Sequence, residues 1–181
     1  MAEAQIAREL PLAGRAAGGA SVSIAPAEPA MRVSLRAPQD SISAVSKGLG
    51  IDLPTRPKQS AVAGARSVLW LGPDEWLVIE EGDRDPMADL ARATALHSAV
   101  DVSHRNTAIL VTGTQASDVL NAGCPQDLSP EAFPVGACSR TVMGKIEVVL
   151  FRTAEDAFRV ECWRSFSDYA FEFLRDAARG H

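Results

Sequence analysis

Two stretches of the sequence follow the same pattern: VSLRAPQDSISAVSKGLGIDLP at residues 33–54 and ILVTGTQASDVLNAGCPQDLSP at residues 109–130. Each begins with apolar residues typical of a strand, passes through a turn into a short helix, and ends in an Asp-Leu pair followed by one more turn. Two copies are too few for a solenoid, which stacks several units. The pattern therefore predicts a duplicated unit inside one domain.

The residues around these stretches extend each unit with a hairpin. Alternating apolar residues and turn residues predict strands near residues 32–36, 67–71, 76–80, 100–103, 107–111, 137–143, 146–151 and 157–163. Apolar residues at helical spacing predict helices at 42–49, 86–97 and 115–122, and a last helix that begins near Ser165. Each unit is thus strand, helix, hairpin, helix, and this mixture is typical of an α+β fold with largely antiparallel sheets.

Polar residues mark the beginnings of two predicted helices. Asp85 followed by Pro86 is a favourable N-cap with proline in the first turn. Ser165 with Asp168 resembles a capping box. The last helix is expected to bury one face, made of Phe166, Tyr169, Ala170, Phe173, Leu174 and Ala177.

Composition favours an ordinary globular protein. The chain has 181 residues, of which 46% are hydrophobic and 23% charged, and its formal net charge is -5. A chain of this length buries enough surface to fold without disulfides or metals, and its acidic balance argues against nucleic acid as a partner. With no recognisable signal peptide and no apolar run long enough to span a membrane, we expect a cytoplasmic protein with no membrane partner.

The N-terminal segment differs from the rest, because residues 12–30 are dominated by Ala, Gly, Ser and Pro. Such a segment has few large apolar groups to offset the entropy lost on ordering. We therefore expect a flexible N-terminal arm over residues 1–30, either disordered or lying on a partner subunit. A single domain should follow over residues 31–181.

No motif for catalysis, a cofactor or a metal is recognisable in the sequence. Cys124, Cys138 and Cys162 form neither a C-x-x-C pair nor a cluster with histidine, so we expect reduced, buried, unreactive thiols. Arg32, Arg36 and Arg66 are expected on a solvated sheet face. The sequence therefore predicts no catalytic, cofactor-binding or metal-binding residue in this chain.

A polar corner, which contains Asp101, His104, Arg105 and Asn106, separates two apolar strands. One interpretation is a site in which Asp101 and His104 bind a substrate or exchange a proton. The other is a hydrogen-bonded corner whose His104 and Arg105 face solvent or a partner. The second is favoured, because a carboxylate and an imidazole without a third orienting group seldom form an active site.

Two tryptophans are candidates for an interface or pocket. Trp163 has the opposite strand phase from Val160 and Cys162, so it should point outward beside Arg164. Interfaces concentrate Trp and Arg, although packing of Trp163 against the last helix is the simpler alternative. Trp76, which follows a hairpin turn, is the second candidate.

Five motifs resemble one known family. They are LGPDEWL at residues 71–77, DVSHRN at 101–106, the stretch from 111–113 through CPQDL at 124–128, FPVGACSRT at 133–141 and RSF at 164–166. Together they resemble the gamma subunit of heterotetrameric sarcosine oxidase, which is similar to the folate-binding domain of the glycine-cleavage aminomethyltransferase. The resemblance covers nearly everything from Met31 onward and implies the fold of that domain.

The resemblance also implies a function. It is that of a structural subunit in an oxidoreductase that demethylates sarcosine to glycine, with hydrogen peroxide and, when tetrahydrofolate is present, methylene-tetrahydrofolate as products. In that family the beta subunit carries FAD and FMN, the alpha subunit binds NAD and folate, and the delta subunit binds zinc. The gamma-like chain is then expected to hold no cofactor and to stabilise the alpha and beta subunits.

Two other functions stay open at this point. The first is a stand-alone, folate-dependent one-carbon binding protein with a pocket near Asp101 and Trp76, which titration with tetrahydrofolate would reveal. The second is a subunit of a related oxidase that acts on another N-methyl amino acid such as dimethylglycine. Substrate profiling of the whole complex would distinguish that enzyme.

Overall fold

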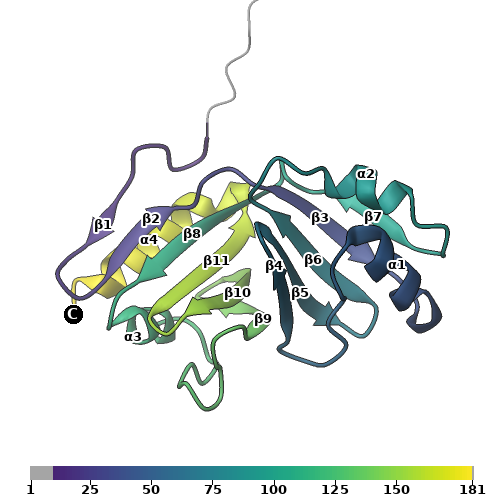
Figure 1. Cartoon of the computed structure of the whole chain (residues 1–181). Helices are drawn as coiled ribbons and strands as arrows, with labels where there is room; N and C mark the ends of the chain where they lie inside the picture. The colour runs from purple at the N-terminus through teal and green to yellow at the C-terminus, as the bar shows by residue number, and fades with distance from the viewer. Residues whose placement is uncertain (1–9, 181) are drawn as a thin grey trace, which may run out of the picture.

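The computed structural model describes residues 10–180, and Figure 1 shows two sheets side by side with helices on their outer sides. The strands are β1 (Ala17–Gly18), β2 (Ser23–Pro26), β3 (Met31–Arg36), β4 (Ser60–Ala63), β5 (Arg66–Gly72), β6 (Glu75–Glu80), β7 (Ser98–Asp101), β8 (Asn106–Thr112), β9 (Cys138–Met143), β10 (Ile146–Ala154) and β11 (Ala157–Trp163). The helices are α1 (Ile42–Leu49), α2 (Pro86–Ala91), α3 (Ala116–Asn121) and α4 (Ser167–Ala178). Short 3-10 turns at Gln39–Ser41 and Arg164–Phe166 precede α1 and α4.

The sheet order confirms the predicted duplication. Within residues 10–180 every strand pairing is antiparallel. One sheet has the order β4-β5-β6-β3-β7, and the other, taken from its opposite edge, has the order β9-β10-β11-β8-β2-β1. In both, a three-stranded meander pairs with the first strand of its own unit. The fold is therefore α+β with repeated strand, helix and hairpin units.

The two units exchange one strand each. β2 leads into β3 along the chain but pairs with β8, whereas β7 leads into β8 but pairs with β3. The connections cross between the sheets and are held by backbone hydrogen bonds from Val102 to Arg32 (2.8 Å) and from Ala27 to Ala108 (2.9 Å). Each sheet is thus completed by the segment that leads into the other unit.

The hydrophobic core forms layers. α1 and α2 cover the outer face of the β3–β6 sheet, and α3 and α4 cover the outer face of the β8–β11 sheet. A smaller apolar layer lies between the sheets and contains Leu69, Leu77, Ile79, Val102, Cys138, Val149 and Phe151. Because each sheet is covered on both faces, its strands are more continuously apolar than a half-exposed sheet would require.

The predicted N-terminal arm is wrong for the part of it that the structure describes. Ser23–Pro26 is a strand inside the β8 sheet, and Ile24 and Val22 are 0% and 3% exposed. A strand needs an apolar side chain only at every second residue, on the face that is buried. Its remaining stability comes from backbone hydrogen bonds, which Ala, Ser and Gly also form. Residues 1–9 of the predicted arm lie outside the described residues.

The helix signals are confirmed at one place and corrected at two. The Asp85 carboxylate accepts hydrogen bonds from the backbone of Met87 (2.8 Å) and Ala88 (3.1 Å), as an N-cap does. However, α2 ends at Ala91 instead of residue 97, because none of residues 91–97 is buried and a longer helix would have no apolar face to cover.

The last helix starts later than its sequence pattern predicts. α4 begins at Ser167 without a side-chain cap, so the capping box at Ser165 is wrong. Its buried face contains Ser167, Ala170, Phe171 and Leu174, while Phe166 and Tyr169 lie outside it. Phe166 belongs to the 3-10 turn before α4, so its side chain does not follow the helical spacing of the residues after it. None of the helices in residues 10–180 combines the length and apolarity needed to span a bilayer.

Candidate functional site

The polar corner lies where the chain crosses from one sheet to the other. The Asp101 carboxylate accepts hydrogen bonds from the Ser103 backbone (2.8 Å) and hydroxyl (2.5 Å). The backbone N–H groups of Arg105 and Asn106 both donate to the Val102 carbonyl at 3.0 Å. These bonds close the turn between β7 and β8, so the geometry favours a hydrogen-bonded corner over a proton-exchanging pair.

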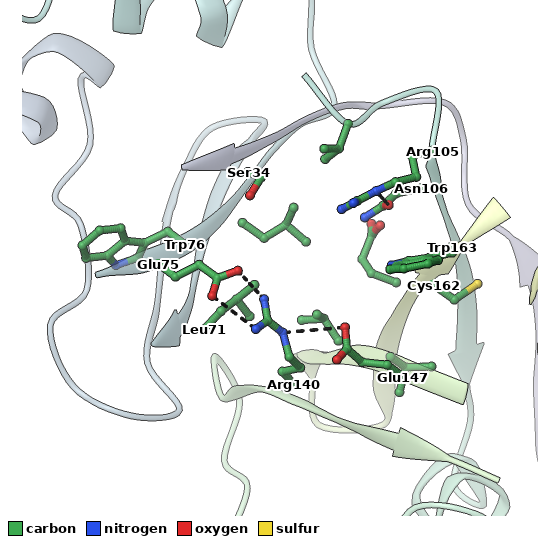
Figure 2. A pocket seen from close by; sticks show the side chains of 15 residues that line it. Ser34, Leu71, Glu75, Trp76, Arg105, Asn106, Arg140, Glu147, Cys162 and Trp163 are labelled. Carbon is green, nitrogen blue, oxygen red and sulfur yellow. Dashed lines mark hydrogen bonds and ion pairs between the residues drawn. The ribbon is translucent and has the colours of Figure 1, made fainter. Parts of the chain in front are cut away.

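A cavity of about 60 Å³ lies between the sheets, next to this corner (Figure 2). Arg105, Asn106 and Trp163 line one side of it, so the structure brings three of the predicted site residues together. Asp101, His104 and Arg164 are not part of its lining. The cavity is large enough for a few water molecules and far smaller than the roughly 300–1,000 Å³ of typical small-molecule sites.

Trp76 contributes to the edge of this cavity, but its ring belongs to the core. Figure 2 shows the indole directed away from the other lining side chains. Trp76 is 0% exposed, and its Nε1 donates to the Pro54 carbonyl at 2.7 Å under the α1 and α2 layer. Asp101 and Trp76 therefore line no common pocket.

An ion pair that was not predicted from the sequence joins the two sheets across the cavity. Arg140 on β9 binds Glu75 at the start of β6, with Nη1 and Oε2 3.2 Å apart, and lies 3.8 Å from Glu147. The hydrogen bond to Glu75 raises the pKa of Arg140 above its usual value. Glu75 lies in LGPDEWL and Arg140 in FPVGACSRT, two of the motifs that resemble the known family. Their presence in these motifs was the one sequence feature that singled out both residues.

A buried chain of charges fixes the crossover behind the cavity. Glu161 accepts from Arg32 Nε at 2.6 Å and from Arg159 Nε at 2.7 Å, and Arg159 also binds Glu81 at 2.6 Å. Arg32 is 3% exposed, so its predicted place on a solvated face is wrong. A partner 129 positions away in the chain neutralises it, which permits burial.

Each unit also buries a further arginine. Arg66 at the start of β5 donates to the Leu49 carbonyl and to Glu80 (2.8 Å), and Arg152 on β10 donates to the Leu128 carbonyl (3.2 Å). Arg66, 2% exposed, was also predicted to be solvated, and that prediction is wrong. Both arginines bind groups of the chain itself, so their role is structural.

The three cysteines are buried, as predicted. Burial is the main cause that raises the pKa of Cys138 and of Cys162 to about 12. Because the thiolate is the nucleophile, both are poor nucleophiles at neutral pH. Cys124 Sγ lies 3.9 Å from the Thr141 hydroxyl.

Trp163 points outward, as its strand phase predicted. Its side of the molecule carries a small cluster in which Trp163 stacks on Phe166 with ring centroids 5.8 Å apart. The Arg105 guanidinium lies over the Trp163 ring, 5.2 Å from its centroid, and the Arg164 backbone N–H donates to the Arg105 carbonyl at 2.7 Å. The sequence candidates Arg105, Trp163 and Arg164 therefore lie together.

Comparisons with known proteins agree with the fold and the motifs. The chain matches the model of the sarcosine oxidase, gamma subunit family over residues 36–180. The sarcosine oxidase subunit gamma of Corynebacterium sp. (strain P-1) is 33% identical over 155 residues, covering 82% of this chain and 75% of that protein. The corresponding protein of an Arthrobacter species is 33% identical over 138 residues, covering 75% and 68%.

Two solved structures share the fold. A chain of the heterotetrameric sarcosine oxidase from Corynebacterium sp. U-96, in complex with pyrrole 2-carboxylate, superposes with a TM-score of 0.85 and 29% identity over 91% of this chain and 88% of that chain. The glycine cleavage system aminomethyltransferase T from Bartonella henselae gives a TM-score of 0.66 and 14% identity over 88% of this chain and 49% of that chain, which confirms the predicted fold likeness. Since the family pattern spans most of its length and its relatives match over most of theirs, the chain belongs to the sarcosine oxidase gamma subunit family.

Proposed function

We propose that this chain is the gamma subunit of a heterotetrameric sarcosine oxidase, an oxidoreductase acting on CH-NH donors with oxygen as acceptor. The complex oxidatively demethylates sarcosine to glycine, with hydrogen peroxide and methylene-tetrahydrofolate as products. The observation that carries the proposal is the superposition on a chain of such a heterotetramer over 91% of this chain, with a TM-score of 0.85. This chain supplies structure to the complex, and the chemistry takes place in other subunits.

The internal contacts of the chain support a structural role. The buried arginines Arg32, Arg66 and Arg152 bind protein carboxylates or carbonyls, and the cavity beside Trp163 is bridged by the Arg140–Glu75 pair. The charged side chains of Arg140, Glu75 and Glu147 at this cavity are thus already paired with one another.

We further propose the partners that the family resemblance implies. They are an alpha subunit that binds NAD and tetrahydrofolate, a beta subunit that carries FAD and FMN, and a delta subunit that binds zinc. The chain then contacts flavin-bearing subunits in the cytoplasm, and its own residues hold none of these groups.

Folate binding by this chain alone does not fit the residues proposed for it. Asp101 is bonded to Ser103, the Trp76 ring lies in the core, and the cavity between the sheets holds about 60 Å³. A second hollow of about 320 Å³ lies beside Leu10 and Pro29, but neither Asp101 nor Trp76 lines it. Tetrahydrofolate that binds with micromolar affinity and is released by Asp101→Ala would nevertheless favour the stand-alone alternative.

The proposal is tested by purifying the tagged chain from the cells that produce it. We expect two large flavoprotein subunits and a small zinc-binding one in the mass spectrum, a flavin absorbance spectrum, and peroxide formation that depends on sarcosine. Preference of that complex for dimethylglycine would identify the related oxidase instead. Recovery of the chain alone and colourless would contradict the proposal.

A further inference from the structure

The exposed aromatic side chains of this protein lie on one stripe. Among the three Trp, one Tyr and six Phe residues, those with large exposed fractions are Trp163 (43%), Phe166 (40%) and Tyr169 (37%). They follow one another at a spacing of three residues, from the end of β11 through the 3-10 turn into α4. We call this set the aromatic stripe.

The aromatic stripe does not belong to the core of the chain. α4 packs on its sheet through Ala170, Phe171 and Leu174, which are all buried. Trp163 and Phe166 instead stack on each other, and the Tyr169 hydroxyl accepts a hydrogen bond from the Lys145 backbone at 3.2 Å. These contacts hold the rings in place and leave their outer surfaces exposed. Aromatic rings fixed in this way lose little entropy on binding, which is typical of interface anchors.

A cation lies at the start of the aromatic stripe. The Arg105 guanidinium stands over the Trp163 ring, and its Nε donates to the Asn106 side chain at 3.3 Å. In residues 10–180, none of the carboxylates lies within ion-pair distance of Arg105. The chain as a whole carries a net charge of -5. A cation that has no acid beside it in the described part of an acidic protein, next to flat apolar rings, matches a partner surface that supplies a carboxylate next to apolar side chains.

The other exposed apolar residues do not form a comparable surface. They are aliphatic and are spread over the segment before β1, β4, the segment after α2, β7, the loop before β9, and β9 itself: Leu10, Val62, Leu96, Val100, Val135 and Val142. Single exposed aliphatic side chains are ordinary on protein surfaces. The contrast favours the aromatic stripe as the anchor.

We propose that the aromatic stripe with Arg105 is the surface through which this chain docks onto another subunit of the sarcosine oxidase heterotetramer. The facing segment of that subunit presents a carboxylate to Arg105 and apolar side chains to Trp163 and Phe166. This inference rests on the proposed function and adds to it the residues that hold the chain in the complex.

The test is dissociation of the purified heterotetramer on dilution, followed by mass photometry. Trp163→Ala combined with Phe166→Ala should raise the concentration of half-dissociation at least about tenfold, the usual effect of removing central aromatic anchors. Arg105→Glu should raise the concentration of half-dissociation to a similar extent. Arg105→Lys, which keeps the charge, should raise it less. The matched controls are Leu96→Ala and Arg56→Glu, both exposed and distant in sequence, which should stay within about twofold of wild type.

A second measurement does not depend on variants that might fold poorly. Hydrogen exchange of the wild-type chain, free and in the complex, should show protection at residues 103–106 and 163–169. Equal half-dissociation for wild type and all stripe variants, or protection confined to other segments, would overturn the proposed surface while leaving the proposed function intact. A chain that forms a homodimer through the aromatic stripe, and remains a homodimer when the flavoprotein subunits are present, would also overturn the proposed surface. If the wild-type chain associates with no flavoprotein, both proposals fail.

Discussion

Replacing Ile24 with alanine tests whether the N-terminal segment belongs to the fold. Ile24 is 0% exposed on β2, opposite Val111 of β8, and contributes to the core under α3 and α4. The substitution removes three carbon atoms, worth about 0.8 kcal/mol each in transfer free energy. Incomplete collapse of the cavity adds to this, and we expect a total loss of about 3–4 kcal/mol in the free energy of unfolding.

Urea unfolding of the full-length chain, followed by circular dichroism, measures this loss. With a dependence of about 2 kcal/mol per molar urea, the midpoint should fall by about 1.5–2 M. Val62→Ala is the matched control, because Val62 is a strand residue that is 60% exposed. Its effect should be within about 0.5 kcal/mol. Equal midpoints for the two variants would refute the structure of this segment and restore the flexible arm.

Three more predictions follow from single contacts. Glu161→Gln removes the carboxylate that Arg32 and Arg159 share and leaves their charges buried without it. The free energy of unfolding, measured in urea, should fall by about 3–5 kcal/mol. A loss under about 1 kcal/mol would contradict the buried network. Asp85→Ala removes the α2 cap and should lower the free energy of unfolding by about 1 kcal/mol, whereas Asp85→Asn, which can still cap, should lose much less. Equal urea midpoints for wild type and Asp85→Ala would show that the cap contributes nothing. Because burial raises the pKa of Cys138 and Cys162 to about 12, alkylation of the native chain at pH 8 should be much slower than in urea and should accelerate as pH rises toward 12; equal rates by mass spectrometry would show accessible thiolates.

Local sequence patterns determined most of the individual elements. The hairpin turns at residues 72–75 and 143–146, the alternation in β8 and β11, and the helical spacing of α1 and α3 are all short-range signals, and the structure contains each element within a few residues. The repeat of the 33–54 pattern at 109–130 also indicated two related units, because the same local preferences recur in the same order. The outward direction of Trp163 followed from strand phase alone.

Tertiary structure decided which elements pair and which charges are buried. β2 and β7 are exchanged between the units, a choice that depends on hydrogen bonds to strands far away in the chain and leaves no local mark. Arg32 appears solvated until Glu161 is brought to 2.6 Å from it, since only the folded chain supplies the charge that permits its burial. The aromatic stripe likewise depends on which face of α4 meets the sheet: Ala170, Phe171 and Leu174 are buried there, and Phe166 and Tyr169 are left exposed.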